Sequence, residues 1–194
     1  QFSVMPISRI DWSFETARVC GRLVGKGDAD LYRELYADAA VMRYIAKGSN
    51  QDEAAAMFAK ALKHNAEPAA RARYWHLSHQ RTGLSLGLAA LVRDAVLPGR
   101  GELGLMLLPH AQHTGVGIQA LTCVIDGALS QRWALGMDEV TGRHAVDNIG
   151  ASRLVEHLGF EPFEIATPGS IGWRMTAGAW GARLASAASD QHHR

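Results

Sequence analysis

The apolar positions of the chain change repeatedly between the period of strands and the period of helices, which predicts a mixed α/β fold. The first half predicts a strand over 16–24, a helix over 29–37 capped by Asp28, a short apolar segment over 41–45, and a helix from Ser49–Glu53 to about His64. A meander of three strands follows at 73–79, 84–93 and 102–108. The second half predicts a helix after Gly117, a strand at 137–145, a helix opened by Asp147 and Asn148, strands at 160–165 and 170–175, and a short helix capped by Thr176, with a frayed tail after Ala185. This order predicts one mixed α/β layer with helices on both faces.

The segment from Gly101 to Ser130 carries the clearest chemistry. An apolar run from Leu103 to Leu108 is closed by Pro109, and a glycine-bearing loop then leads into a helix. Such an arrangement gathers free backbone N–H groups and the positive end of a helix dipole in one place, which favours phosphate binding. Gly115 and Gly117 remove side chains that would crowd a pyrophosphate. The segment therefore predicts a phosphorylated cofactor.

Composition narrows the class of protein. With 194 residues, of which 47% are apolar, the chain fits one ordinary domain with a core. A formal charge of +1 argues against nucleic-acid binding driven by bulk charge. Cys20 and Cys123 have no partner at metal spacing and are interpreted as free thiols in a reducing compartment. Since neither a spanning apolar run nor a signal peptide is visible, we expect a cytoplasmic protein without membrane contact.

The glycine loop fits a more specific pattern. Residues 112–117, Gln-His-Thr-Gly-Val-Gly, match Q/R-x-x-G-x-G/A, and the chain resembles the GNAT-superfamily N-acetyltransferases, whose acyl-CoA pyrophosphate loop carries this pattern. Other segments resemble, in the same order, those of the RimJ/RimL-like branch (ribosomal-protein-alanine acetyltransferase-like): Glu15–Val19, Asp38–Ile45, Asn148 with Ser152, and Glu156–Phe160. The resemblance covers about residues 15–176.

The resemblance implies a GNAT-like fold with a central, mostly antiparallel sheet. It places an N-terminal arm at 1–14, the acetyltransferase domain at 15–180 and a flexible tail at 181–194. It implies acetyl-CoA as co-substrate, no metal, and direct attack by a primary amine, either a protein N-terminus or a small molecule, in a ternary complex; a homodimer stays open. The implied acetyl-CoA contacts are Gln112, His113, Thr114, Gly115, Val116, Gly117, Met106, Leu107, Leu108, Asn148 and Ser152.

Glu102 is the candidate general base. It begins the strand that leads into the loop, among apolar neighbours where desolvation would strengthen it as a base. The alternative is an edge carboxylate paired with an arginine. Many RimJ/RimL-like chains carry a Glu shortly after the second loop glycine, where this chain has Leu121, with Gln119 nearby.

Two helix residues and the strand end complete the predicted site. By the resemblance, Ser152 would hydrogen-bond the leaving sulfur and Asn148 the pantetheine amide, although Asn148 also fits a helix cap. A backbone N–H between Met106 and Leu108 would stabilise the oxyanion, where the family's strand diverges from its neighbour. The helix has no tyrosine to act as the acid that many GNAT enzymes use.

Three other functions are compatible with parts of the sequence. A catalytically silent acyl-CoA-binding or regulatory domain would keep the same loop. Gly115-x-Gly117-x-x-Ala120 also fits a dinucleotide fingerprint, which would indicate a nicotinamide-dependent oxidoreductase, but residues 109–114 separate it from the strand, and the preceding strands form a meander. The His76-x-x-His79 and His110-x-x-His113 pairs have metal-ligand spacing without nearby cysteine or acidic partners, and His192-His193 is a weaker signal.

Overall fold

The computed structural model describes residues 10–45 and 51–191. Its strands are β1 (Phe14–Glu15), β2 (Val19–Leu23), β3 (Ala72–His79), β4 (Ser85–Arg93), β5 (Arg100–Leu107), β6 (Glu139–Ala145), β7 (Glu161–Phe163) and β8 (Ser170–Thr176). They form one sheet in the order β1-β2-β3-β4-β5-β6-β8-β7. All neighbouring pairs are antiparallel except β5 and β6, which are parallel. The predicted mixed sheet is therefore confirmed, and it is mostly antiparallel.

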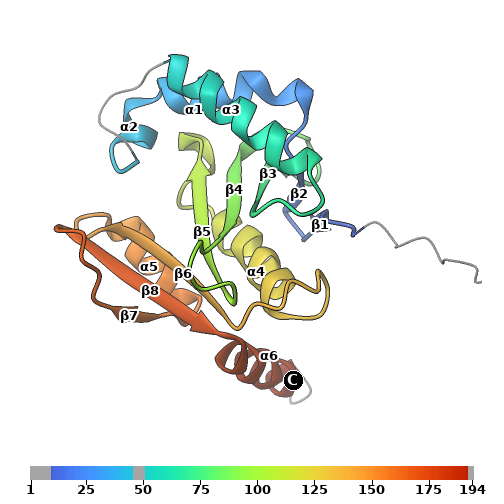
Figure 1. The fold of residues 1–194 in the computed structure, drawn as a ribbon, viewed down its shortest axis with the longest axis vertical. Coiled ribbons are helices and arrows are strands. Elements are labelled where there is room, and N and C mark those ends of the chain that lie inside the picture. The colour runs from blue at the N-terminus through green and yellow to red at the C-terminus, as the bar shows by residue number, and fades with distance from the viewer. Residues whose placement is uncertain (1–9, 46–50, 192–194) are drawn as a thin grey trace, which may run out of the picture.

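Helices cover both faces of this sheet (Figure 1). The helical segments are η1 (Lys26–Asp28), α1 (Ala29–Ala37), α2 (Ala39–Met42), α3 (Gln51–Ala66), η2 (Pro109–Ala111), α4 (Val116–Leu129), α5 (Ile149–His157) and α6 (Ala177–Gln191). α1, α2 and α3 enclose one apolar cluster with Tyr74 and Leu88 of the sheet. α4 lies on the opposite face, where it contacts α5 and α6.

The larger core lies under α4 and is centred on stacked tryptophans. Trp75 of β3 and Trp133, which follows α4, are both fully buried, with ring centroids 5.3 Å apart. Trp12 packs on Trp133 with a centroid separation of 5.2 Å. The indole N–H of Trp75 donates to the carbonyl of Trp12, and that of Trp133 donates to the carbonyl of Asp11. Burial of these rings therefore leaves neither indole N–H unsatisfied, and it fixes the segment before β1.

Several predicted boundaries need correction. Residues 16–24 were predicted as one strand, but residues 16–18 form the turn of the β1–β2 hairpin, because Thr16 hydrogen-bonds back to Val19. The final helix was predicted to be short, but α6 continues to Gln191, as its alanine-rich composition favours. Asp28 occupies the N-cap position of α1 without capping it, since its carboxylate binds other partners. The predicted helix start at Ser49 and Asn50 and the His192-His193 pair lie outside the described residues.

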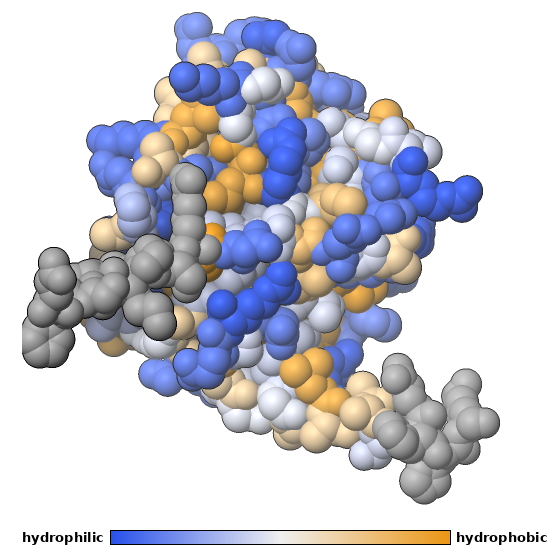
Figure 2. Space-filling model, turned by 90° about the vertical axis from the view of Figure 1, so that its right-hand side faces the viewer, coloured by the Kyte–Doolittle hydropathy of each residue, from blue (hydrophilic) through white to orange (hydrophobic). Residues whose placement is uncertain are grey.

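The surface is mixed in character. Figure 2 shows hydrophilic residues interspersed with smaller hydrophobic areas on one face of the molecule. Within the described part of the chain, no helix has both the length and the apolar character needed to cross a bilayer.

Candidate active site

The site begins where β5 and β6 separate. Their pairing covers only Arg100–Glu102 with Glu139–Thr141, whereas β5 continues to Leu107 and β6 to Ala145. In Figure 1, β6 and β8 accordingly run at a marked angle to β4 and β5. The edge of β5 that faces β6 is therefore left without a strand partner beyond Glu102, as far as the described residues show.

Backbone geometry identifies which N–H groups face this opening. The N–H of Leu108 donates to the carbonyl of Leu86, on the β4 side. Because N–H groups alternate between the two edges of a strand, the N–H groups of Leu105 and Leu107 point toward β6. The carbonyl of Leu107 points the same way and accepts a 3.0 Å hydrogen bond from Gln112 Nε2. Of the three residues predicted to supply an oxyanion donor, Leu107 has its N–H in the opening, whereas Leu108 has its N–H engaged elsewhere.

The loop after β5 is held by local contacts and unusual backbone angles. His113 has φ +58° and Gly115 has φ +83°, both in the left-handed region. The Thr114 hydroxyl donates to the carbonyl of Ala111 at 2.6 Å. A left-handed residue is tolerated best when it is glycine, which explains Gly115 at the N-cap position of α4. The loop is thus preformed at the start of the helix.

The first turn of α4 presents free donors. The first backbone bond within the helix runs from Gln119 N–H to the carbonyl of Gly115 at 3.3 Å, so the N–H groups of residues 116–118 have no acceptor inside the helix. The aligned peptide dipoles add roughly half a positive charge at this end. Gly117 sits against β5, since a Cβ there would lie 3.1 Å from Leu105 Cδ2. This end of α4 fits an anion with several oxygens, such as a pyrophosphate.

Arg18 is a basic residue at this loop to which the sequence analysis gave no role. Its guanidinium donates to the carbonyl of Thr114 and lies 3.8 Å from where a Cβ on Gly115 would be. The sequence showed Arg18 only as a member of a strand motif, and the 96 residues between it and Thr114 hid the contact. Arg18 adds a formal positive charge beside the α4 N-terminus.

α5 brings the second group of predicted residues to the same place. Asn148 is its N-cap, because its Oδ1 accepts the N–H of Ala151 at 3.1 Å. Ser152 lies one turn further along α5 and is half-buried. A Cβ on Gly150 would lie 3.8 Å from the His113 ring, so the start of α5 lies next to the loop. The structure thus brings the loop and α5 together beside the β5–β6 opening.

Glu102 lies where β5–β6 pairing ends, but its surroundings differ from the expected apolar ones. Its side chain is 47% exposed, and its carboxylate lies 3.1 Å from Arg143 Nε. Met106, on the same face of β5, packs against the cluster under α1 and α3. The carboxylate can therefore be reached from solvent, and it has the arginine partner that the sequence left as an alternative.

Neighbouring groups offer little competing chemistry. His144 of β6 accepts the Trp173 indole N–H at Nε2 and donates from Nδ1 to the carbonyl of Ala145, so its lone pair is engaged. Burial raises the pKa of the Cys123 thiol, which disfavours the nucleophilic thiolate. Among the described residues, no group of three His, Cys, Asp or Glu side chains could hold a metal ion.

Comparison with known proteins agrees with this geometry. The family model described as "Acetyltransferase (GNAT) domain" matches residues 18–161. No curated protein matches the chain by sequence. The fold resembles that of a spermidine N-acetyltransferase from Vibrio cholerae in complex with CoA and spermine, with a TM-score of 0.69 and 17% identity over 85% of this chain and 99% of that one.

Two further solved structures share the fold. A ribosomal-protein-S5-alanine acetyltransferase from Vibrio fischeri has a TM-score of 0.66 and 17% identity, over 88% of this chain and 99% of that one. FdhC, a nucleotide-linked sugar GNAT, has a TM-score of 0.74 and 15% identity, over 92% and 98%. At these identities the likeness concerns the fold alone. The strands before the loop form an antiparallel meander, and residues 108–115 separate β5 from α4, whereas a dinucleotide fingerprint joins the strand to the helix by a tight turn within repeated parallel βαβ units.

Proposed function

Because the chain belongs to the GNAT acetyltransferase family, we propose that it moves an acetyl group from acetyl-CoA to a primary amine. The observation that carries this proposal is the meeting of the β5–β6 opening with the preformed loop at the start of α4. The opening supplies unpaired strand edge for an extended, amide-containing arm, and the helix end supplies N–H donors for phosphate. Together they suit the two chemically different parts of an acyl-CoA.

The proposed cofactor path uses the predicted residues. The pyrophosphate binds at Gln112–Gly117, with Arg18 adding positive charge at the outer side. The pantetheine arm lies along Met106–Leu108 of β5. Asn148 uses Oδ1 for the helix cap, which leaves its amide N–H groups for a pantetheine carbonyl. Ser152, one turn along α5, donates to the leaving sulfur.

The proposed reaction is direct attack in a ternary complex. Glu102 takes one proton from the incoming ammonium, the neutral amine nitrogen forms a bond to the acetyl carbon as the C–S bond breaks, and the second proton of that nitrogen passes to the leaving thiolate. The N–H of Leu107, which faces the opening, stabilises the oxyanion. The Glu102 carboxylate lies 3.1 Å from Arg143 Nε, so the incoming amine must displace that guanidinium to reach it.

For the acceptor, we propose RimJ/RimL-like chemistry on a protein N-terminus or on a small primary amine. The two similar acetyltransferases act, by their names, on spermidine and on an alanine of a ribosomal protein, and both acceptors present amines. The order of motifs along residues 15–176 supports the RimJ/RimL-like assignment.

Replacing Glu102 by Gln tests this proposal. We expect kcat for a primary amine to fall about 100-fold, because the variant cannot accept the proton, while the Kd for acetyl-CoA changes less than about twofold. Steady-state kinetics and calorimetric titration of acetyl-CoA measure the two effects. Arg143→Gln is the matched control, since it breaks the same ion pair and keeps the carboxylate.

Two outcomes would contradict the proposal at different points. Full activity of Glu102→Gln would show that another group, or desolvation alone, removes the proton. Tight acetyl-CoA binding by the unaltered protein, with no turnover of peptide N-termini, spermidine or other primary amines, would favour the silent acyl-CoA-binding domain instead.

A further inference from the structure

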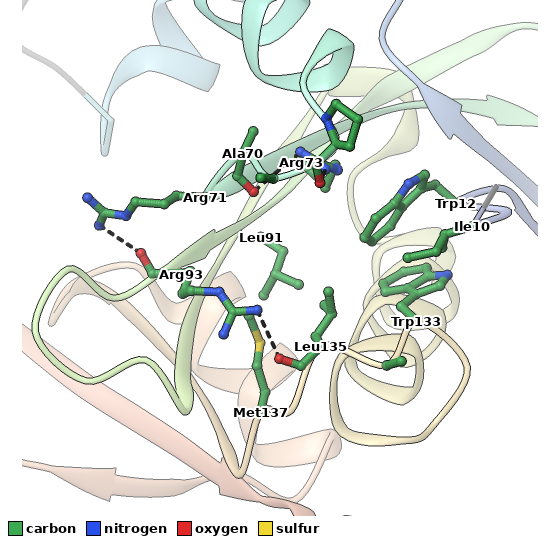
Figure 3. Close-up of a pocket in the computed structure, with 13 residues that line it drawn as sticks. Ile10, Trp12, Ala70, Arg71, Arg73, Leu91, Arg93, Trp133, Leu135 and Met137 are labelled. Atoms are coloured by element: carbon green, nitrogen blue, oxygen red, sulfur yellow. Dashed lines mark hydrogen bonds between the residues drawn. The ribbon is translucent and has the colours of Figure 1, made fainter. Parts of the chain in front are cut away.

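Apart from the proposed acetyl-CoA site, a pocket lies on the α4 face of the sheet, at the end of α4 opposite to the loop (Figure 3). It has a volume of about 180 Å³. Trp12, Trp133 and Leu91 form an apolar wall, and Arg71, Arg73 and Arg93 supply its charges. No aspartate or glutamate is among the described residues that line it. The pocket wall therefore combines aromatic surface with three cations, and the nearby acid, Asp94, lies outside the wall.

Arg73 is the most deeply placed of these cations. Its residue is only 5% exposed, and its guanidinium lies 4.8 Å from the centre of the Trp12 ring. Its terminal nitrogens donate only to backbone carbonyls, those of residues 64, 67, 68, 70 and 72. Its Nε is buried without a hydrogen-bond partner. Burial also lowers the pKa of Arg73 below its ordinary value.

The other two arginines are held in the same way. Arg93 donates to the carbonyls of Pro98 and Leu135, and Arg71 donates to the carbonyl of Arg93. Carbonyl dipoles orient a guanidinium without neutralising its formal charge. Elsewhere in the chain, by contrast, Arg22, Arg100 and Arg143 each pair with a carboxylate. The three pocket arginines thus concentrate positive charge in a protein whose formal net charge is only +1, with Asp94 as an electrostatic neighbour of Arg71.

We propose that this pocket binds a small organic carboxylate with an apolar or aromatic body. The arginines supply the anion partners, with bidentate geometry available at a guanidinium. The partly exposed ring of Trp12, backed by the buried Trp133 and Leu91, favours an apolar body over a fully hydrated inorganic ion. The volume of about 180 Å³ lies below the range of roughly 300–1,000 Å³ of pockets for drug-sized ligands, so the ligand is small.

The pocket is separate from the proposed acetyl-CoA site. The loop precedes α4 and Trp133 follows it, and a 14-residue helix is about 21 Å long. Gly101 faces Leu91 and Met137 of the pocket, so Glu102, the next residue, points to the other face of the sheet. A ligand here leaves both the loop and the Glu102 carboxylate free.

Benzoate is the probe for this proposal. Trp12 and Trp133 line the pocket, so tryptophan fluorescence and thermal shift both report its occupancy. We expect saturable binding of benzoate, with at least tenfold weaker binding of benzamide, its neutral isostere, and of inorganic phosphate. Arg93→Gln and Arg71→Gln should each weaken benzoate binding at least tenfold, because each removes one cation. Arg183→Gln, which removes an exposed arginine that also donates to a backbone carbonyl, should leave benzoate binding unchanged.

Four outcomes would overturn this proposal, and a fifth would overturn only the proposed function. Equal binding of benzamide would show an apolar pocket without anion recognition, and tighter binding of phosphate would show a site for inorganic anions. Unchanged benzoate binding in both Arg93→Gln and Arg71→Gln would place the ligand elsewhere. A saturating concentration of CoA should not displace benzoate, and displacement would mean that benzoate binds in the acetyl-CoA site. If CoA itself fails to bind while benzoate binds, the proposed function is wrong and the carboxylate site stands.

Discussion

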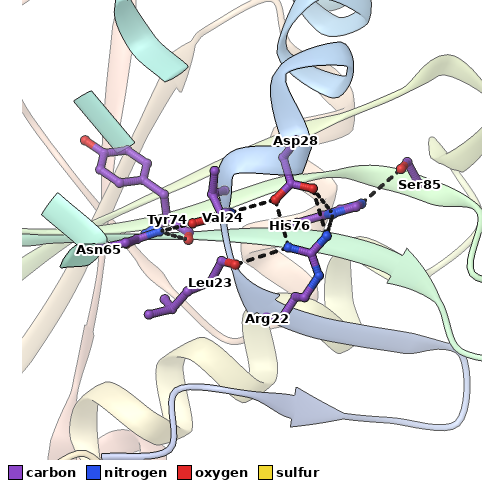
Figure 4. Close-up of polar contacts among 9 residues, drawn as sticks. Arg22, Leu23, Val24, Asp28, Asn65, Tyr74, His76 and Ser85 are labelled. Atoms are coloured by element: carbon purple, nitrogen blue, oxygen red, sulfur yellow. Dashed lines mark hydrogen bonds and ion pairs between the residues drawn. The ribbon is translucent and has the colours of Figure 1, made fainter. Parts of the chain in front are cut away.

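At the scale of single residues, Asp28 shows how a buried charge ties elements together (Figure 4). It is 5% exposed and accepts hydrogen bonds from both terminal nitrogens of Arg22 and from the N–H of Gly25. Its carboxylate also lies 2.9 Å from His76 Nδ1. His76 in turn contacts the hydroxyl of Ser85 through Nε2. The carboxylate thus joins β2, η1, β3 and β4 around the first turn of α1.

This network predicts a loss of stability in acid. Burial alone would raise the pKa of Asp28, but hydrogen bonds from Arg22 and Gly25 outweigh it and hold the pKa at about 2, below the ordinary 3.8. The charged carboxylate therefore stabilises the fold above about pH 4, by roughly 2 kcal/mol, and this contribution disappears as the pH falls toward 2. Urea titrations should show Asp28→Asn destabilised at pH 7 and its difference from the unaltered protein shrinking near pH 2. Asp30→Asn, which removes an exposed acid of α1, is the control and should change little at either pH.

At Gly127, close packing leaves no room for a side chain. A Cβ at this position in α4 would lie 2.5 Å from the ring of the fully buried Trp133. Gly127→Ala should therefore lower the free energy of unfolding by about 1–3 kcal/mol, even though alanine is the better helix former. Gly178→Ala in α6 is the matched control, because nothing lies near its Cβ, and it should stabilise by up to about 1 kcal/mol. Equal effects in thermal unfolding would show that Trp133 moves aside freely.

At the scale of elements, the junction of β5, the loop and α4 predicts separable effects on stability and binding. Gly115 and Gly83 have φ of +83° and +70°, so alanine at either position should cost about 1–2 kcal/mol of backbone strain. Only Gly115 lies at the proposed pyrophosphate loop; Gly83 lies in the β3–β4 turn. We therefore expect similar losses of melting temperature, but a CoA affinity at least tenfold weaker in Gly115→Ala alone. Equal CoA affinities in the two variants would remove the loop from the proposed site.

The elements also show how far the sequence could be used to predict this protein. The meander, α4 and α5 follow from local periods, and the loop from its glycines, because each signal lies within a few residues. The strand β1 was not predicted as a separate strand, because its two residues are too few to show an alternation of apolar and polar positions. Arg18 at Thr114 and Arg143 at Glu102 join segments far apart in the chain, so only the sheet topology places them. The pairing of β5 with β6 likewise cannot be read from either strand alone.

At the scale of the whole molecule, the C-terminal helix is part of the fold only at its beginning. Trp180 is 3% exposed and its indole N–H lies 3.3 Å from Asp126 of α4, whereas residues 181–189 are exposed. Trp180→Ala should cost about 3–5 kcal/mol, because a large ring leaves the core. Removal of the residues after Ala185 should change stability by less than about 0.5 kcal/mol. Calorimetric unfolding of the two variants measures both changes in stability. A large loss of stability on truncation would show that the exposed end of α6 also supports the fold.

The tryptophan stack also sets the order in which the chain can fold during synthesis. Asp11 accepts its hydrogen bond from Trp133, a residue 122 positions later in the sequence. The segment before β1 therefore leaves the ribosome long before its packing partner exists. Closing so long a loop is also slow compared with local pairing. β2 can pair with β3 as soon as β3 has been made, but the contact of Asp11 with Trp133 must wait for α4 and Trp133, and the core under α4 closes only then.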